Sequence, residues 1–566
     1  MTYLRGFFKR HRRHLLALAG FSLLTMLMTW PLVLHWSTHI TGTEPGDNFE
    51  LLWLFRWVAT ALQQGTDPWF APHIYAPYGY PIVYGEVTPI HSFLLAPLTL
   101  GLGEIVTYNL ITVLSTVMTG WGVFALTDRW LAGLAEPDDS RLRFLAAFFA
   151  ATAFTFATYR LAKMQQGHLN LFVTQWLVMG LYFWDRWLVH TRLRDAALVG
   201  LAFGLAALST WYLGVMLGIG LLVYALAYGE PLGRMRERRV IAGLMLAALI
   251  AAIMIVPFLL PYADIESVPE IPIEEVSFWS VSPTDYVLPN PLHPLWGRYT
   301  APLAWPFPFT LPPEFAVSIG FVTAFFAFVG ARRAKGPRWR ALKWVVLVAF
   351  VLSLGPYLHI SRLPLPIPLP ALILRELPVF SSLRTWIRFA FVVQLGLSIL
   401  GGAGIYLTLR SPRAARFRHG LAAALIGLVL FEAWPGSLGI VPVEPRPVDL
   451  WLAAQADDAP IMEYPLSVAE SGPSLFYTLF HGKPITYAYG TFFEQIYLTR
   501  NPELATFPAD AALDALQAWG VRQILITLSA MDDEPFTLDE VNSQPRLAYV
   551  RTEGAIAIYN LASPAE

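Results

Sequence analysis

The chain has 566 residues, of which 55% are hydrophobic and only 14% charged, and its mean hydropathy is +0.50. A water-soluble globular protein of this length cannot bury so much apolar surface, so the composition excludes that class and predicts a polytopic membrane protein. The formal net charge of −1 points to no nucleic-acid partner, and the absence of cysteine excludes disulfides, thiol catalysis and Cys-ligated zinc.

Membrane-spanning segments are predicted from long uncharged runs, because a helix needs roughly 17–25 mostly apolar residues to cross a bilayer. The first run follows a basic N-terminus and precedes no small-residue cleavage site, which predicts a retained signal anchor. The run 196–228 is too long for one helix and predicts a hairpin that turns near Ser209–Tyr212. Eleven spans result, from the runs 15–36, 105–127, 144–159, 169–184, 196–228, 240–263, 315–331, 344–358, 389–409 and 420–431.

Basic clusters predict the orientation of these spans, because positive charge is retained on the cytoplasmic side. All five clusters can lie inside if an even number of spans separates each pair; they are the N-terminus, 190–195, 234–239, 332–340 and 410–418. The apolar piece 87–103 would break this parity, so it is interpreted as a helix in the outer interface. The N-terminus is then cytoplasmic, and the outer segments are 37–104, 160–168, 264–314, 357–388 and everything after about 442.

The last 125 residues have a different pattern, with short alternating strands around one helical stretch. They predict a small extracytoplasmic α/β domain. The expected organisation is therefore a transmembrane module over 1–441, with a long first outer loop at 37–104, followed by the α/β domain over 442–566.

The first outer loop begins with three carboxylates, Glu44, Asp47 and Glu50, within seven positions. An amphipathic stretch that predicts a surface helix follows, and then a segment rich in proline, glycine and aromatic residues over 66–86. Asp47 directly precedes the helix, so its carboxylate either caps the helix N-terminus or performs chemistry. Both interpretations remain open from the local sequence.

Basic residues also lie on the side where they are normally rare. They are Arg160, Lys163, Arg375, Arg384 and Arg388. Each one either snorkels at a helix end or contributes to binding an anion outside the cytoplasm.

Several weak motifs, in order and all in predicted outer segments, give the chain a resemblance to a known superfamily. They are Gly46-Asp47 with Leu52-Trp53, Pro77-Tyr78-Gly79, Gln166 to Asn170, and Leu383 to Phe389. With a first span, an early acidic motif, surface helices and a many-span bundle, the chain resembles the GT-C integral-membrane glycosyltransferases. That superfamily includes protein O-mannosyltransferases, lipid A aminoarabinose transferases and oligosaccharyltransferase catalytic subunits.

The resemblance implies transfer of a sugar from a polyprenyl-phosphate-linked donor to an extracytoplasmic acceptor at the cell membrane, with a glycan, lipid or protein as acceptor. Relatives place a catalytic carboxylate just after the first span, where this chain has Asp47, the candidate general base. Glu50 lies on the same helical face and holds a metal, orients an arginine or is merely solvated. The candidate ligands of the departing phosphate are Arg160, Lys163, His168, Arg384 and Arg388, with His168 equally open to a structural role.

A divalent cation is an open question in this picture. The acidic cluster has enough oxygens for a hard cation, but 160–168 lacks the second acidic group that metal-using relatives supply. Metal-independent transfer is the favoured expectation. The expected site combines Asp47 and the basic residues in one cavity that faces away from the cytosol.

Two other functions are compatible with the composition. A transporter or lipid flippase would usually show two related halves and charged residues within its spans, and neither pattern is evident. A non-catalytic assembly protein built on the same scaffold is disfavoured only by the presence of Asp47 and the outer cations.

Overall fold

The computed structural model describes residues 2–134, 139–229, 237–264, 271–306, 313–466, 468–488, 502–533 and 535–562. Contacts between residues divide the chain into two compact units. The helical unit comprises residues 1–34, 110–259 and 270–438, and the mixed unit comprises 35–109, 260–269 and 439–566.

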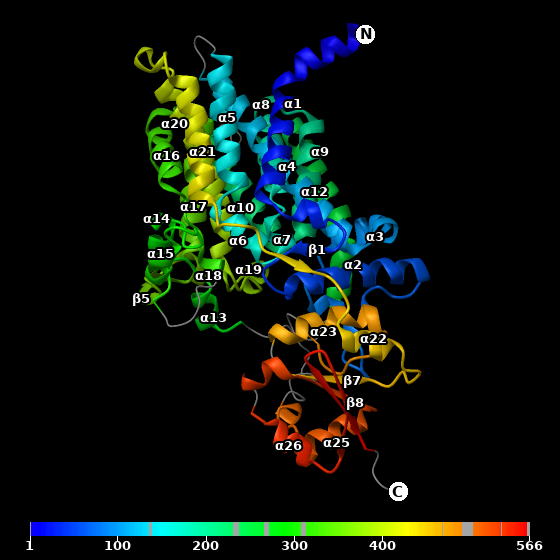
Figure 1. The fold of residues 1–566 in the computed structure, drawn as a ribbon. Helices are drawn as coiled ribbons and strands as arrows, with labels where there is room; N and C mark the ends of the chain where they lie inside the picture. The colour runs from blue at the N-terminus through cyan, green and yellow to red at the C-terminus, as the bar shows by residue number, and fades with distance from the viewer. Residues whose placement is uncertain are drawn as a thin grey trace. The chain divides into compact units, whose positions relative to one another are not determined.

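Long apolar helices build the helical unit and run side by side (Figure 1). Each of the ten predicted runs overlaps one of these long helices, except the run 196–228, which overlaps two. These helices are α1 (Thr2–Met28), α4 (Glu104–Ala132), α5 (Ser140–Thr155), α8 (Gln175–His190), α9 (Leu193–Ser209), α10 (Trp211–Tyr228), α12 (Arg238–Leu259), α16 (Phe321–Arg333), α17 (Pro337–Ser353), α20 (Ala390–Leu409) and α21 (Arg418–Ala433).

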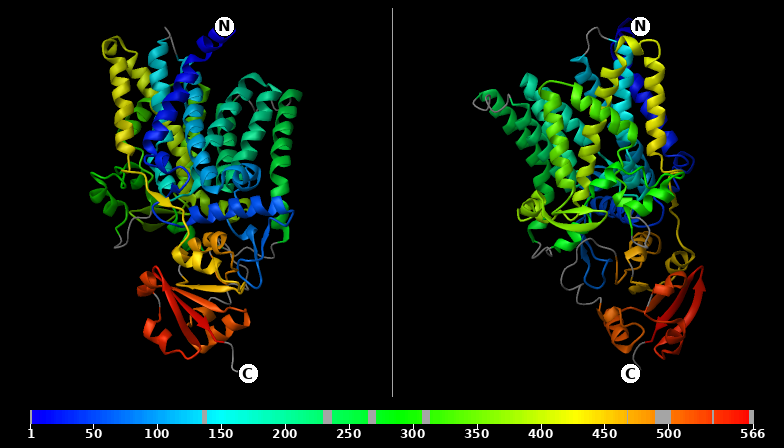
Figure 2. Two further views of the ribbon diagram at one scale, coloured as in Figure 1. Left: turned by 45° about the vertical axis from the view of Figure 1, so that its right-hand side comes forward. Right: turned by 90° about the vertical axis from the view of Figure 1, so that its left-hand side faces the viewer.

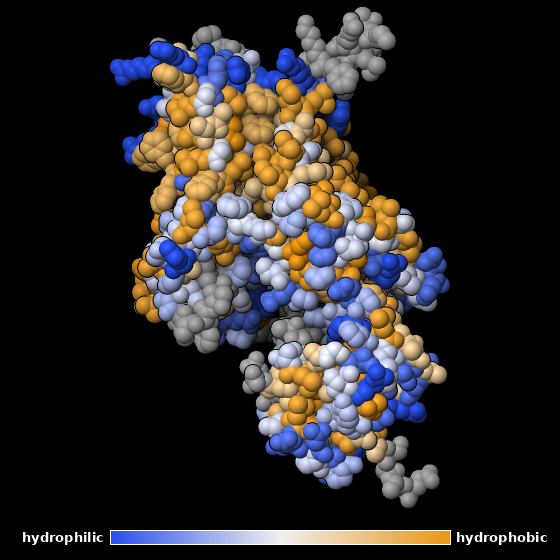
Figure 3. All heavy atoms as spheres, viewed as in Figure 1, coloured by the Kyte–Doolittle hydropathy of each residue, from blue (hydrophilic) through white to orange (hydrophobic). Residues whose placement is uncertain are grey.

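Within the described residues, four helices are long and apolar enough to cross a membrane, and a fifth span results if the bent pair 140–155 and 158–165 counts as one. Others, such as α16 with 13 residues and α21 with 16, are shorter than a typical span. The face of the helical unit seen in Figure 3 is largely hydrophobic, as a lipid-facing surface is. The chain is therefore a membrane protein of mostly helical structure, and the number of eleven crossings stays a prediction.

Shorter elements connect the long helices of the helical unit. The predicted hairpin is confirmed, since α9 and α10 are separated by Thr210 alone, in an extended conformation. The connecting elements are α6 (Thr158–Gln165), α7 (Leu169–Phe172), α13 (Ile273–Phe278), α14 (Pro283–Val287), α15 (Gly297–Ala304), β4 (Tyr357–Ile360), β5 (Leu363–Pro368), α18 (Pro370–Leu374) and α19 (Pro378–Ser381).

A four-stranded sheet is the centre of the C-terminal part of the mixed unit (Figure 2). Its order is β7 (Ile461–Tyr464), β8 (Gln523–Thr527), β10 (Ile556–Leu561) and β9 (Leu547–Glu553), with β7 parallel to β8 and the other pairs antiparallel. Alternate residues of the strands pack with α25 (Asp510–Ala518) and α26 (Leu538–Ser543) into a hydrophobic core. Short strands around a helical stretch, as the alternating pattern predicts, are thus present in this part of the chain.

The first loop belongs to the mixed unit. Its strand β1 (His39–Thr41) pairs with β6 (Ile440–Pro442), and the expected surface helix is α2 (Asp47–Gln64). The apolar face of α2 packs on protein, for example with Phe49 against Phe476 of α23 (Val468–His481) at 4.9 Å between ring centroids. Contacts thus group residues 35–109 with 439–566, and the predicted domain boundary at 441/442 remains a prediction.

The remaining elements of the mixed unit are short. They are β2 (Phe70–Ala71), β3 (Tyr80–Pro81), the π-helix η3 (Ile90–Leu94), α3 (Ala96–Leu102) and α22 (Pro447–Ala453). The apolar piece 87–103, expected to form an interfacial helix, therefore consists of η3 and α3.

Candidate functional site

The acidic cluster lies at the start of α2, within the mixed unit. Gly46 occupies the N-cap position, and the oxygen that accepts backbone N–H groups there belongs to Asn48, at 2.8 Å from the Gly46 N and 3.0 Å from the Phe49 N. The interpretation of Asp47 as the helix cap is therefore wrong: Asp47 is the first residue of the helix. Asp47 is half-buried, while Glu44 is exposed.

Glu50 is the buried member of the cluster, with 8% of its surface exposed. Burial raises the pKa of the Glu50 carboxyl well above its ordinary value, and the nearby carboxylates of Asp47 and Glu86 raise it further. A hydrogen bond from the Glu86 backbone N–H opposes these effects. Gly85 leaves room for the Glu50 carboxyl, because a Cβ at position 85 would lie 3.2 Å from Glu50 Oε1.

In the helical unit, a second buried carboxylate gathers cations. Glu314 is 4% exposed, accepts a hydrogen bond from the Tyr159 hydroxyl at 2.6 Å and forms an ion pair with Lys163. Arg388 Nε lies 3.9 Å from Glu314 Oε1, and its guanidinium lies 4.1 Å from the centre of the Tyr212 ring. Two of the predicted phosphate ligands, Lys163 and Arg388, are therefore brought together around one acid.

The other predicted phosphate ligands have different surroundings. Arg160 is fully buried and donates to the backbone carbonyls of Thr155 and Phe172, the latter at 2.7 Å from Nη2 and 3.2 Å from Nε. These contacts tie together the ends of α5 and α7 and favour a structural role. His168 lies just before α7, and its backbone N donates to the Lys163 carbonyl at 3.0 Å.

Arg384 is the most accessible of the five predicted phosphate ligands, with 43% of its side chain exposed. Its Nη1 lies 3.4 Å from Glu275 Oε1, in a pair that is exposed on both sides. Such a pair is weak in water, so the guanidinium can exchange its partner for a phosphate at low cost.

For metal binding, the described residues contain no group of three or more His, Asp or Glu side chains that could hold an ion. A cation at the start of α2 would have Asp47, Glu50 and Glu86 as its nearest carboxylates. The expectation about metal dependence stays a prediction.

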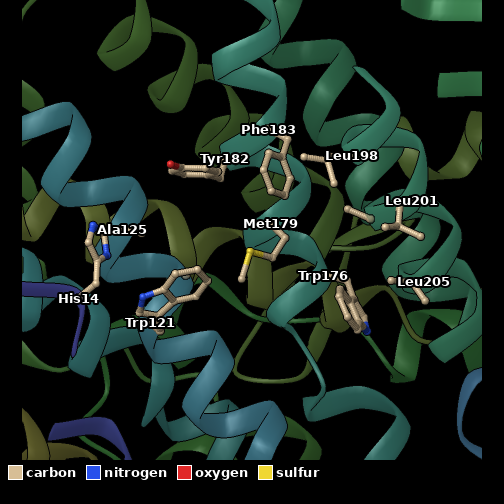
Figure 4. A pocket seen from close by; sticks show the side chains of 12 residues that line it. His14, Trp121, Ala125, Trp176, Met179, Tyr182, Phe183, Leu198, Leu201 and Leu205 are labelled. Atoms are coloured by element: carbon tan, nitrogen blue, oxygen red, sulfur yellow. The ribbon is translucent and has the colours of Figure 1, made fainter. Parts of the chain in front are cut away.

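An apolar cavity of about 260 Å³ lies between helices of the helical unit (Figure 4). Figure 4 shows Trp121 of α4, Met179 and Phe183 of α8 and Leu198 of α9 around it. Its lining is almost entirely hydrocarbon and indole, which suits a hydrocarbon chain and no charged substrate.

Comparisons with known proteins place this geometry in context. No protein-family model and no curated protein matches the chain, but several solved structures do. The arabinofuranosyltransferase AftD from Mycobacteria matches with a TM-score of 0.61 and 15% identity over 98% of this chain and 40% of AftD. The apo oligosaccharyltransferase of Archaeoglobus fulgidus matches with a TM-score of 0.56 and 14% identity over 92% of this chain and 70% of that one.

The chain has the GT-C fold. It spans about two fifths of the length of AftD. The same archaeal oligosaccharyltransferase in complex with Zn and sulfate matches with a TM-score of 0.53 and 13% identity over 91% of this chain and 68% of that one. The resemblance drawn from the motifs is thus confirmed at the level of the fold.

Two candidate residues of this GT-C chain escaped the sequence analysis. Glu314 is the last residue of a predicted outer segment, directly before an apolar run, and Glu86 closes the aromatic segment of the first loop. The sequence did contain a signal for Glu314. It is a single acidic residue at a predicted membrane boundary, on the same predicted side as Lys163 and Arg388.

Proposed function

We propose that this chain is a membrane glycosyltransferase that moves a sugar from a polyprenyl-phosphate-linked donor to an extracytoplasmic acceptor. The observation that carries the proposal is the carboxylate pair Asp47–Glu50 at the start of α2, in the loop that follows the first long helix of a chain with the GT-C fold. A pair of carboxylates in different protonation states is what proton transfer at neutral pH requires.

Asp47 is the proposed general base. It takes the proton of the acceptor hydroxyl as that oxygen bonds to the sugar carbon, while the bond from this carbon to the phosphate oxygen breaks and leaves its electron pair on the phosphate. In this proposal Glu50 stays protonated because of its burial. It can then donate a hydrogen bond, and it does not compete with Asp47 for the proton of the acceptor hydroxyl. The proposal leaves the acceptor class as glycan, lipid or protein.

Lys163 and Arg388 are the proposed partners of the departing phosphate. Glu314 holds the Lys163 ammonium and lies beside the Arg388 guanidinium, so both cations are in place before the charge develops. Arg384, whose guanidinium is accessible, is a third proposed phosphate ligand. Arg160 and His168 instead position the segment between α6 and α8. The apolar cavity of Figure 4 is the proposed place for part of the isoprenoid chain.

The base assignment is tested with Asp47→Asn, assayed with labelled polyprenyl-phosphate pentoses and hexoses in proteoliposomes. Loss of a general base lowers the rate by about 10²–10⁴-fold. Asp67→Asn is the matched control, because Asp67 is an exposed carboxylate of the same loop. Equal rates for wild type and Asp47→Asn would refute Asp47 as the base.

The same assay separates transfer from transport. A transferase releases polyprenyl phosphate and produces a covalently glycosylated acceptor, whereas a flippase moves the intact donor across the bilayer. For the metal question, metal-independent transfer predicts that excess EDTA leaves the rate unchanged. Restoration of an EDTA-inhibited rate by added Mg²⁺ or Mn²⁺ would instead show a metal requirement.

A further inference from the structure

A basic pocket lies at one end of the seam between α10 and α17, and none of the carboxylates and cations described above lines it. Its volume is about 560 Å³. Of the described residues that line it, three are cationic and none is acidic: Tyr228, Gly229, Lys335, Gly336, Pro337, Arg340 and Lys343. Three cations held together, with no acid among the described lining residues, indicate an anionic ligand.

Backbone contacts fix two of these cations in place. Arg340 Nε donates to the Ala227 carbonyl at 2.8 Å and Nη2 to the Tyr228 carbonyl at 2.9 Å, so the guanidinium lies at the C-terminal end of α10. These bonds use two of its five N–H groups. Lys343 Nζ donates to the Ala331 carbonyl at 3.1 Å.

Gly229 lets the guanidinium approach this closely. It has φ of +92°, and a Cβ at this position would lie 3.0 Å from Arg340 Nη2. The end of α10 is thus shaped around the arginine, which supports a built pocket over a chance surface cluster.

Exposed apolar side chains lie close to the pocket residues on the same two helices. Leu226 of α10 is two residues before Tyr228, Trp344 of α17 directly follows Lys343, and both expose half of their surface. Farther along the seam, Val223, Val345 and Val348 line an apolar crevice of only about 10 Å³, which is too small for a hydrocarbon chain. A charged pocket beside exposed apolar side chains matches the two parts of a phospholipid.

We propose that this pocket binds the phosphate headgroup of an anionic glycerophospholipid, whose acyl chains lie against the exposed side chains of Leu226 and Trp344. Basic pockets at the membrane surface between helices are suited to such headgroups. A free phosphate would satisfy the cations but would leave the exposed Leu226 and Trp344 without a role. The proposal is independent of the proposed transferase activity.

The test is a lipid titration of the full-length protein in neutral detergent, followed by native mass spectrometry. Removal of two charges in Lys335→Gln/Lys343→Gln is expected to weaken phosphatidylglycerol binding about tenfold or more. Arg332→Gln/Arg333→Gln is the matched control, because it removes two exposed charges at the end of α16 that do not line the pocket. The control is expected to bind within about twofold of the wild type.

Two further arms identify the ligand. Phosphatidylcholine is expected to bind at least about tenfold more weakly than phosphatidylglycerol to the wild type, and millimolar inorganic phosphate is expected not to displace the lipid. Equal binding of both lipids, displacement by inorganic phosphate, or an equal loss in the control variant would each overturn the proposal. If the double variant does not fold, Lys335→Gln alone is expected to give a smaller loss in the same direction, and no loss would overturn it.

Discussion

Glu50 lies in the first turn of α2, where burial and two neighbouring carboxylates oppose its ionisation. A residue of this type would be exposed if its only purpose were to make the helix soluble. Instead, burial raises the pKa of the Glu50 carboxyl. Ionisation of this group therefore destabilises the folded state relative to the unfolded state. The pH dependence of stability therefore includes a contribution from this carboxyl group.

Glu50→Gln is predicted to change that pH dependence. A carboxyl whose pKa is raised on folding contributes stability that is complete below its ordinary pKa of 4.5 and is lost as pH rises through the folded value. The midpoint of thermal unfolding, followed by tryptophan fluorescence in detergent, should therefore fall less between pH 5 and pH 8 in Glu50→Gln than in the wild type. Identical pH profiles would contradict the assigned burial of the charge.

Arg362 forms a buried ion pair with Asp285. Its Nη2 donates to Asp285 Oδ2 at 2.5 Å and its Nη1 to the Ser280 carbonyl at 2.9 Å, and its guanidinium lies 3.7 Å from the centre of the Phe315 ring. Burial raises the pKa of Asp285 to about 6 in spite of the arginine. The pair is nearly excluded from water, so each charge depends on the other.

Arg362→Met is predicted to destabilise the protein by about 3–5 kcal/mol, because it leaves a buried carboxylate unpaired. The additional change Asp285→Asn should recover a large part of this loss, since no charge then remains to be buried. Denaturant titrations of the three variants form a double-mutant cycle, and strict additivity of the two single effects would show that the pair is not coupled.

At the scale of elements, apolar runs and strand alternation were sufficient to locate the long helices and the four strands of the sheet. Thr210 between two apolar runs marked the hairpin, and Gly320, with φ of +77°, marks the start of α16 more exactly than hydropathy did. Glu314 was missed because its partners Tyr159 and Lys163 are more than 150 residues away. Hydropathy reports whether a segment is buried, and it carries no information on which distant side chain a buried charge will meet.

The crossing of α16 and α20 gives a prediction at this scale. A Cβ on Gly404 would overlap the Phe326 carbonyl and lie 3.0 Å from the Gly330 N, so the two backbones touch. Gly404→Ala is predicted to destabilise the protein by about 2 kcal/mol or more, because neither backbone can yield without moving a helix.

Gly427→Ala in α21 is the matched control, since a Cβ there meets nothing within 4 Å. Its stability should be unchanged or up to about 1 kcal/mol higher, because alanine favours the helix. Equal effects of the two alanines on thermal unfolding in detergent would contradict the close backbone contact.

At the scale of the whole molecule, the sequence analysis separated the first outer loop from the C-terminal residues, whereas contacts combine them in the mixed unit. Strand β1 pairs with β6 across about 400 residues of chain, and neither short strand has an alternating pattern that distinguishes it from a loop. The composition of each segment indicated whether it spans the membrane or lies outside it. Composition could not predict the pairing of β1 with β6, because that pairing depends on backbone hydrogen bonds between distant segments.

Orientation in the membrane is the final prediction, and the absence of native cysteine makes it directly measurable. Single cysteines are placed at exposed Thr43, near the carboxylates, at exposed Ser382, near Arg384, and at exposed Ala415 in a predicted cytoplasmic loop. Basic residues are retained in the cytoplasm, so a membrane-impermeant maleimide added to whole cells should label Thr43→Cys and Ser382→Cys but not Ala415→Cys. Ala415→Cys should react only after the membrane is opened. Asp47 and the proposed phosphate ligands can serve one reaction only from the same side, so opposite labelling of Thr43→Cys and Ser382→Cys would exclude the proposed transfer chemistry while leaving the fold intact.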